Sequence, residues 1–132
     1  MKPTKEVVEL FEKDRFATEN GMVIEDVEDG SAVCGMRLAG RHKNAVGNVM
    51  GGVYFTLADF AFAVATNWKK PGIVSLHSDI AFLSTPKGKE LHAKALRVRE
   101  GRSTCYYRIE VSDELGNLAA VINTTGYQTA KR

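Results

Sequence analysis

Residues 51–68 read GGVYFTLADFAFAVATNW, and this stretch decides the fold. It has the length and the Ala, Phe and Leu content of a helix, and it is apolar on nearly every side, which predicts burial all round. Asp59 is its only residue that is charged at neutral pH. An unpaired carboxylate loses much free energy on burial, so it either finds a partner or has its pKa raised. Asp59 is therefore a candidate functional residue, the alternative being an Asp satisfied by a neighbouring amide or by a partner chain.

Strand-like segments flank this helix on both sides. Thr4 caps a first, amphipathic helix whose apolar stripe runs from Val7 to Phe16 and which ends at 19–21. The expected strands cover 22–28, 32–38, 74–82, 91–99, 104–111 and 118–127. Consecutive strands joined by short turns pair antiparallel, so the sequence predicts an α+β fold with one antiparallel sheet wrapped around one long central helix. One curved sheet covers only part of such a helix, and a second subunit could cover the rest.

The size and charge of the chain narrow the function further. Residues 1–132 are expected to form a single domain. The 18 Lys and Arg residues against 16 Asp and Glu give a net charge of +2, which is too balanced for a dedicated nucleic-acid binder. Small basic clusters, at 41–43, at 69–70 and at Lys87 with Lys89, are solvated surface or meet a local anion such as a nucleotide phosphate.

The remaining features predict a cytoplasmic protein without a membrane anchor. Cys34 and Cys105 lie far apart without a CxxC motif, which predicts two reduced, buried thiols. The N-terminal residues lack the apolar core of a signal peptide, and residues 51–68 fall short of the ~20 apolar residues that span a bilayer. His77 and Asp79 are spaced to share one strand face, but two ligands without a third make a poor site, so no metal is expected.

The run HKNAVGNVMGGVYFTLADFAFAVATN, residues 42–67, resembles the motif region of hotdog-fold thioesterases, in the branch that includes phenylacetate-pathway enzymes. That branch has the pattern His-x-Asn-x-x-Gly-x-x-His-Gly-Gly, followed by the Asp of a Leu-Ala-Asp triplet. The residues that match it are His42, Asn44, Gly47, Gly51, Gly52 and Asp59. Met50 stands where the pattern has its second histidine, so any help of that imidazole in orienting substrate or water is absent.

The resemblance implies a hotdog fold and an acyl-CoA thioesterase, which hydrolyses a thioester to free coenzyme A and a carboxylic acid. The carbonyl oxygen becomes negatively charged during this reaction, and backbone N–H groups at a helix N-terminus suit that charge. The resemblance assigns this contact to the N–H of Gly51. It assigns to Asp59 the role of nucleophile or of general base to a water, and to Asn44 the positioning of water or thioester. Without the resemblance, the glycines are a tight loop-to-helix junction and Asn44 is a turn residue.

Further residues are candidate substrate contacts through the same resemblance. Ser75 looks like the family's Ser or Thr beside the acyl chain. Arg102 and Ser103 match a Gly-Arg/Lys-Ser turn near the phosphates of coenzyme A, and Lys87 is a second phosphate candidate. The substrate-binding candidates are thus Gly52, Ser75, Lys87, Arg102 and Ser103. Coenzyme A enters as part of the substrate, and no separate cofactor is expected.

The spacing of Gly51 and Asp59 predicts a shared site. At a rise of 1.5 Å per residue they lie roughly 12 Å apart along one helix axis, and at roughly 100° per residue they point about 80° apart. One thioester carbon cannot contact both on the same helix. The sequence therefore predicts a two-fold homodimer in which Asp59 faces Gly51 of a second subunit, and the resemblance implies that such dimers often pair into a homotetramer.

Two other functions share these features. A non-catalytic hotdog module that binds acyl-CoA as a sensor or carrier has the same fold, and Met50 gives it some support. A dehydratase on the same fold is disfavoured, because that chemistry typically pairs a histidine with a carboxylate. The joint presence of Asp59, Gly51 and Asn44 favours the hydrolase.

Overall fold

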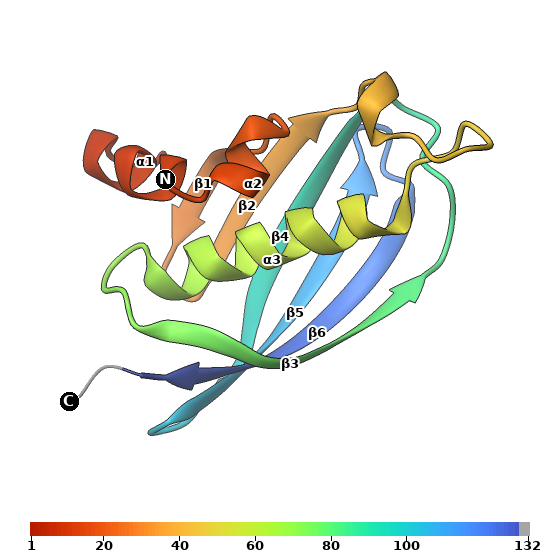
Figure 1. Ribbon diagram of the computed structural model, residues 1–132. Coiled ribbons are helices and arrows are strands. Elements are labelled where there is room, and N and C mark those ends of the chain that lie inside the picture. The colour runs from red at the N-terminus through yellow and green to blue at the C-terminus, as the bar shows by residue number, and fades with distance from the viewer. Residues whose placement is uncertain (130–132) are drawn as a thin grey trace.

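One antiparallel sheet of six strands curves around a single long helix, as Figure 1 shows. The computed structural model describes residues 1–129. The helices are α1 (Lys5–Glu12), α2 (Arg15–Glu19) and α3 (Gly51–Asn67), with a 3₁₀ turn, η1 (Gly40–His42). The strands are β1 (Val23–Glu28), β2 (Ser31–Arg37), β3 (Ile73–Phe82), β4 (Glu90–Glu100), β5 (Thr104–Asp113) and β6 (Leu118–Gln128). The predicted α+β architecture, one antiparallel sheet around a long central helix, is confirmed.

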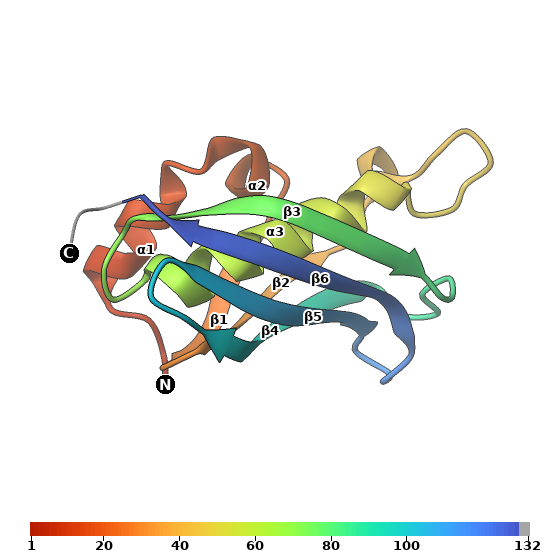
Figure 2. The same ribbon diagram turned by 90° about the horizontal axis from the view of Figure 1, so that it is seen from below.

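The strands lie in the order β1-β2-β4-β5-β6-β3, and every neighbouring pair is antiparallel. The chain thus crosses the concave face of the sheet as α3 before it adds β3 at the far edge. In Figure 2 the strands pass in front of α3, which shows that the sheet covers one side of the helix. The opposite side of α3 receives no strand from the described part of the chain.

The inner face of the sheet is apolar and closely packed against α3. On β5, Cys105, Tyr107, Ile109 and Val111 are buried while the intervening residues are mostly exposed, as the predicted alternation requires. On β4 the inward positions include Ala93 and Ala95, whose small side chains let the helix approach the sheet. The Phe62 ring of α3 meets the Tyr107 ring edge-on, with 5.5 Å between ring centroids.

The prediction that α3 is buried all round is wrong for the single chain. Gly52, Phe55 and Asp59 are exposed, and their spacing of three and four residues places them on one stripe of the helix. The physical reason is that the sheet covers one side and the N-terminal helices only part of the other. We call this uncovered face, formed by Gly52, Phe55 and Asp59, the open stripe.

The N-terminal region forms two short helices instead of the one predicted. Thr4 caps α1 as expected, its hydroxyl accepting from the N–H of Val7 at 3.3 Å. The helix then tightens, because the N–H of Asp14 bonds to the carbonyl of Phe11 at 3.0 Å, and the chain restarts as α2. Phe11 packs edge-on against the Phe60 ring of α3. Of the expected apolar stripe, Phe16 is 72% exposed, so the stripe continues only in part.

The cysteines behave as predicted within the described residues. Cys34 and Cys105 are free and buried, and burial raises the pKa of both thiols, which makes them unreactive. No helix among residues 1–129 is long and apolar enough to cross a membrane.

Candidate active site

The N-terminus of α3 opens onto a pocket of about 400 Å³. Met50 precedes Gly51 in extended conformation and provides no side-chain cap. Within the described chain no carbonyl or side chain accepts from the N–H of Gly51, so this donor is available to a ligand. A Cβ on Gly51 would lie 3.1 Å from the Phe82 ring, which explains the glycine. The pocket residues are Val49, Gly51, Tyr54, Phe82, Leu83, Ser84 and Thr85.

Asn44 organises the loop that leads into α3. Its side-chain oxygen accepts from the N–H groups of Val46 and Asn48, each at 3.0 Å. Gly47 completes the turn with a φ of 85°, a conformation that favours glycine. The loop is closed by a bridge between Lys43 and Val49 and projects from the body of the molecule, as Figure 2 shows. The oxygen of Asn44 is therefore used locally, while its amide N–H groups remain for other partners.

His42 and Met50 flank the Asn44 loop in the sequence. The Ala39 N–H donates to His42 Nδ1 at 2.9 Å, so the other ring nitrogen, Nε2, carries the proton and donates to the Asn20 carbonyl at 3.2 Å. Burial lowers the pKa of His42, which keeps the ring neutral. His42 thus anchors the loop. Met50 is half exposed, and its methyl group lies over Gly52, where a Cβ would be 2.8 Å away.

Asp59 lies in the middle of the open stripe. Its carboxylate has no hydrogen bond or ion pair among residues 1–129. It lines a depression of about 180 Å³, whose walls are both polar and apolar, together with Asp14, Phe16, Ala17, Phe55, Thr56 and Phe60. Desolvation by these neighbours raises its pKa, and the charge of Asp14 adds to the effect. The carboxylate is exposed rather than deeply buried as expected, but it is unpaired and made more basic.

The structure keeps the Gly51 and Asp59 sites apart within one chain. Both residues belong to α3, with Gly51 at its first position and Asp59 two turns later. Gly51 opens towards Phe82 and the end of β3, whereas Asp59 opens towards the α1–α2 junction. A single acyl carbon therefore cannot contact both groups of one subunit.

Ser75 lies on the inner face of the edge strand β3. It pairs with Gly126 of β6, and a Cβ on Gly126 would lie 2.8 Å from the Phe62 ring of α3. Directly paired residues in an antiparallel sheet point to the same face, so Ser75 also faces the helix side. Its position fits a contact to a substrate held beside α3.

A hydroxyl pair beside Ser75 was missed at the sequence level. Ser78 and Thr124 are 2.8 Å apart between their hydroxyl oxygens, and Thr124 is buried. A bulge between Ser75 and His77 shifts the strand register, so Ser75 and Ser78 share the inner face although they are three residues apart. A strict alternation predicts the wrong face for one of them.

The two predicted phosphate contacts lie at opposite ends of one subunit. Lys87 follows the Ser84–Thr85 wall of the Gly51 pocket, and the N–H of Lys87 donates to Asp113 at 2.8 Å. Arg102 and Ser103 form the β4–β5 turn, at the end of the sheet where α3 finishes, and both are exposed. Sequence reasoning placed Asp113 in a hairpin turn but missed that this buried carboxylate holds the Lys87 loop in place.

The pKa of Asp113 reflects this structural task. Burial alone would raise its pKa, but hydrogen bonds from Asn117 and from the N–H groups of Lys87 and Gly88 lower it well below the usual range. Asp113 is thus an ionised anchor between the β3–β4 and β5–β6 connections, and its only sequence signal is its place at the start of the polar turn 113–117.

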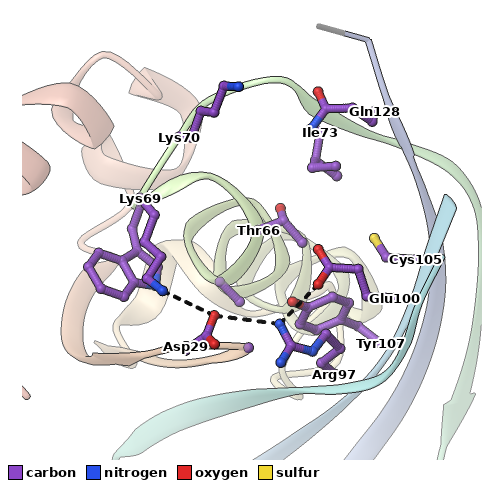
Figure 3. Close-up of a pocket in the computed structure, with 13 residues that line it drawn as sticks. Asp29, Thr66, Lys69, Lys70, Ile73, Arg97, Glu100, Cys105, Tyr107 and Gln128 are labelled. Atoms are coloured by element: carbon purple, nitrogen blue, oxygen red, sulfur yellow. Dashed lines mark hydrogen bonds and ion pairs between the residues drawn. The ribbon is translucent and has the colours of Figure 1, made fainter. Parts of the chain in front are cut away.

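A larger pocket, of about 520 Å³, lies at the C-terminal end of α3 (Figure 3). Four of its charged side chains form a network of ion pairs. Arg97 contacts Asp29 at 3.5 Å and Glu100 at 3.4 Å, and Lys69 contacts Asp29 at 3.3 Å. Neither Asp59 nor Gly51 lines this pocket. Both of its carboxylates, Asp29 and Glu100, are thus engaged in ion pairs.

His77 and Asp79, which share one strand face in the sequence analysis, lie on the edge strand β3. His77 and Asp79 pair with Thr125 and Asn123 on the outer face of β3, as their spacing predicts. No group of three or more His, Cys, Asp or Glu side chains that could hold a metal occurs in the described 129 residues.

Comparisons with known proteins agree with this architecture. A family described as the thioesterase superfamily matches residues 46–120, more than half of the chain. The chain is similar to the acyl-coenzyme A thioesterase PaaI of Escherichia coli strain K12, with 32% identity over 106 residues that cover 80% of this chain and 76% of PaaI.

Two solved structures extend the similarity to the whole fold. The Escherichia coli PaaI protein superposes with a TM-score of 0.87 and 28% identity, over 92% of this chain and 89% of PaaI. A hypothetical thioesterase from Streptococcus pneumoniae, solved with coenzyme A, gives a TM-score of 0.83 and 26% identity, over 92% of this chain and 98% of that protein. The sheet wrapped around α3 is therefore a hotdog fold.

Proposed function

This chain belongs to the thioesterase superfamily and is a thioester hydrolase, and we propose that it hydrolyses acyl-CoA at a site built from Asp59 of one subunit and Gly51 of another. Support for acyl-CoA comes from the similarity to PaaI and to a thioesterase solved with coenzyme A. The observation that carries the site is an unpaired carboxylate of raised pKa on the open stripe, two turns from an unused helix N-terminus.

In the proposed reaction Asp59 acts on one side of the thioester and Gly51 on the other. As general base, Asp59 takes a proton from a water whose oxygen attacks the carbonyl carbon; as nucleophile, its own oxygen attacks and water later releases the acyl group. The carbonyl oxygen becomes negative in either case, and the N–H of Gly51 at the helix N-terminus stabilises it. The C–S bond then breaks, and coenzyme A leaves as the thiol.

The other candidate residues take supporting positions in this proposal. Ser75 lies on the inner face of β3, where it can touch the water or the acyl group. The side-chain N–H groups of Asn44 and the backbone of Gly52 lie near the Gly51 end of α3, where they position the thioester. Lys87 of one subunit and the Arg102–Ser103 turn of the other bind the nucleotide phosphates. Neither metal nor separate cofactor takes part.

The oligomer follows from the same geometry. In a two-fold homodimer the α3 helices pair through their open stripes, and each Asp59 meets the partner's helix N-terminus. This pairing also covers Phe55, which is exposed in the single chain. Two such dimers form the proposed homotetramer.

Release of free thiol from a panel of acyl-CoA and aryl-acyl-CoA esters, followed with a thiol reagent, tests the proposal. We expect turnover of at least one ester class. The alternative function is a module that binds acyl-CoA without hydrolysing it. Met50, which stands where the family pattern has a histidine, gives this alternative some support. Measurable binding of the esters with no thiol release from any of them would establish that module instead.

Arg102→Ala should raise KM for CoA esters by roughly three- to fivefold, the scale of a solvent-exposed ionic contact. It should leave KM for N-acetylcysteamine esters, which lack the nucleotide, nearly unchanged, because a guanidinium beside a phosphate acts on binding and not on the acyl carbon. Steady-state kinetics on matched ester pairs measures both effects.

Arg37→Ala is the matched control, since Arg37 pairs with Glu90 at the opposite end of β4 from Arg102. It should change neither KM. An equal rise for both ester types in Arg102→Ala would remove Arg102 from the nucleotide site.

A further inference from the structure

The α1–α2 junction places a second carboxylate in the depression that holds Asp59. Asp14 and Asp59 line the same space of about 180 Å³, together with uncharged residues only, so Asp14 is the one charged neighbour there among the described residues. The two residues are 45 positions apart in sequence and come from different helical elements. A nearby like charge disfavours the ionised form of a carboxylate, and the Asp59 carboxylate shares this small space with that of Asp14.

The backbone of Asp14 is fixed on both sides. Its N–H bonds to the Phe11 carbonyl at 3.0 Å, and its own carbonyl accepts from the N–H and the hydroxyl of Thr18, each at 3.1 Å. Phe11 in turn packs on Phe60 of α3 with 6.3 Å between ring centroids. The junction is therefore held against the helix that carries Asp59.

The carboxylate of Asp14, in contrast, is not used by the fold. Asp at the first flanking position of a helix normally accepts a hydrogen bond from the helix N-terminus. Asp14 occupies this position of α2 but makes no side-chain cap bond, and it has no ion pair in the described part of the chain. An Asp that neither caps nor pairs, beside the catalytic candidate, has no evident structural task.

We propose that Asp14, which lines the same depression as Asp59, is a positioning residue of the hydrolytic reaction and acts on it only through the Asp59 carboxylate. The inference rests on the proposed role of Asp59. A carboxylate that holds its proton more strongly is the better proton acceptor, provided that it is still ionised at the working pH. Asp14 thus adjusts the base strength of Asp59 from outside the reacting atoms, and its effect reaches the substrate only through Asp59.

Asp14→Asn should move the acid limb of the pH profile of kcat/KM downwards by roughly 0.5–1 pH unit, within the usual range for interacting carboxylates. The sign follows from the chemistry: activity needs ionised Asp59 and is lost as pH falls through its pKa, and removing the like charge lowers that pKa. The plateau kcat should fall slightly, about two- to fivefold, because the base is weaker. The shift should shrink at high salt.

Two variants and one spectroscopic readout complete the test. Asp14→Glu keeps the charge and should restore the acid limb, while Glu6→Gln removes an exposed charge of α1 outside the depression and should leave it unmoved. NMR titration of the Asp59 carboxyl carbon, labelled with ¹³C, follows its protonation without turnover. In Asp14→Asn its midpoint should fall by the same amount as the kinetic limb.

The outcomes separate this inference from the proposed function. An unchanged Asp59 titration in folded Asp14→Asn would overturn the role of Asp14, whatever Asp59 does in catalysis. A shifted titration combined with full activity of Asp59→Asn would instead overturn the role of Asp59 in the hydrolysis and leave only the coupling of the two carboxylates.

Discussion

Asp59→Asn is expected to lower kcat for acyl-CoA hydrolysis by roughly 10²–10⁴-fold, the usual scale for a lost acid–base group. The amide has nearly the shape of the carboxylate but can neither accept a proton from water nor attack the thioester. Asp59→Ala should show a loss of the same order. Stopped-flow or steady-state thiol release on the best ester of the panel measures both variants against wild type.

The fold should survive this change. Desolvation and Asp14 raise the pKa of Asp59, so its ionised form is less favourable in the folded than in the unfolded chain. Above the folded pKa the neutral amide removes this penalty, and the free energy of unfolding at pH 7 should stay equal or rise. Asp79→Asn, on the outer face of β3, is the matched control and should keep its activity. A folded Asp59→Asn with near-complete turnover would remove Asp59 from the reaction.

Gly51→Pro should lower kcat by roughly 10²–10³-fold, the scale for the loss of one oxyanion donor. Proline at the first position of a helix is well tolerated, because the N–H there has no helical partner. Met50 already has φ −65° and ψ 138°, the extended conformation that a residue before proline requires. The substitution therefore removes the N–H while the helix can still begin at the same place.

Gly51→Ala separates the N–H from steric effects. Alanine keeps the donor but adds the same Cβ, 3.1 Å from the Phe82 ring, so both variants press on Phe82 alike. The ratio of kcat between alanine and proline variants then reports the N–H itself, and circular dichroism checks that α3 persists. If both variants have the same kcat, the loss comes from crowding and the Gly51 N–H is not the oxyanion donor.

Most of the fold could be predicted from local patterns. The strands appeared within one or two residues of their expected bounds, and on β5 the alternation of inner and outer residues is the one predicted. The bulge at Ser75–His77 escaped this reasoning, since an inserted residue breaks the period of two on which it depends. The break of the first helix at Asp14 also escaped it, because local hydrogen bonds to Phe11 override an otherwise helical pattern.

Only part of the candidate site could be predicted from the sequence. Asp59 could be found because a single charge in an apolar helix is conspicuous, but its exposure depends on how far the sheet reaches around α3. Asp14 could not be found, since the sequence pattern placed it inside one continuous helix and its nearness to Asp59 is a tertiary contact. Asn44 fits both interpretations, because its oxygen forms the turn and its nitrogen remains available.

Subunit mixing measures most directly whether Asp59 and Gly51 of different subunits form one site. Asp59→Asn and Gly51→Pro, each nearly inactive alone, are combined, dissociated and reassociated, and native mass spectrometry with one isotope-labelled partner confirms the exchange. A heterodimer joins the intact Asp59 of one subunit to the intact Gly51 of the other. Half of the randomly formed dimers then carry one good site out of two, so activity should return to about a quarter of wild type. No recovery despite proven exchange, or an active monomer, would contradict the shared site.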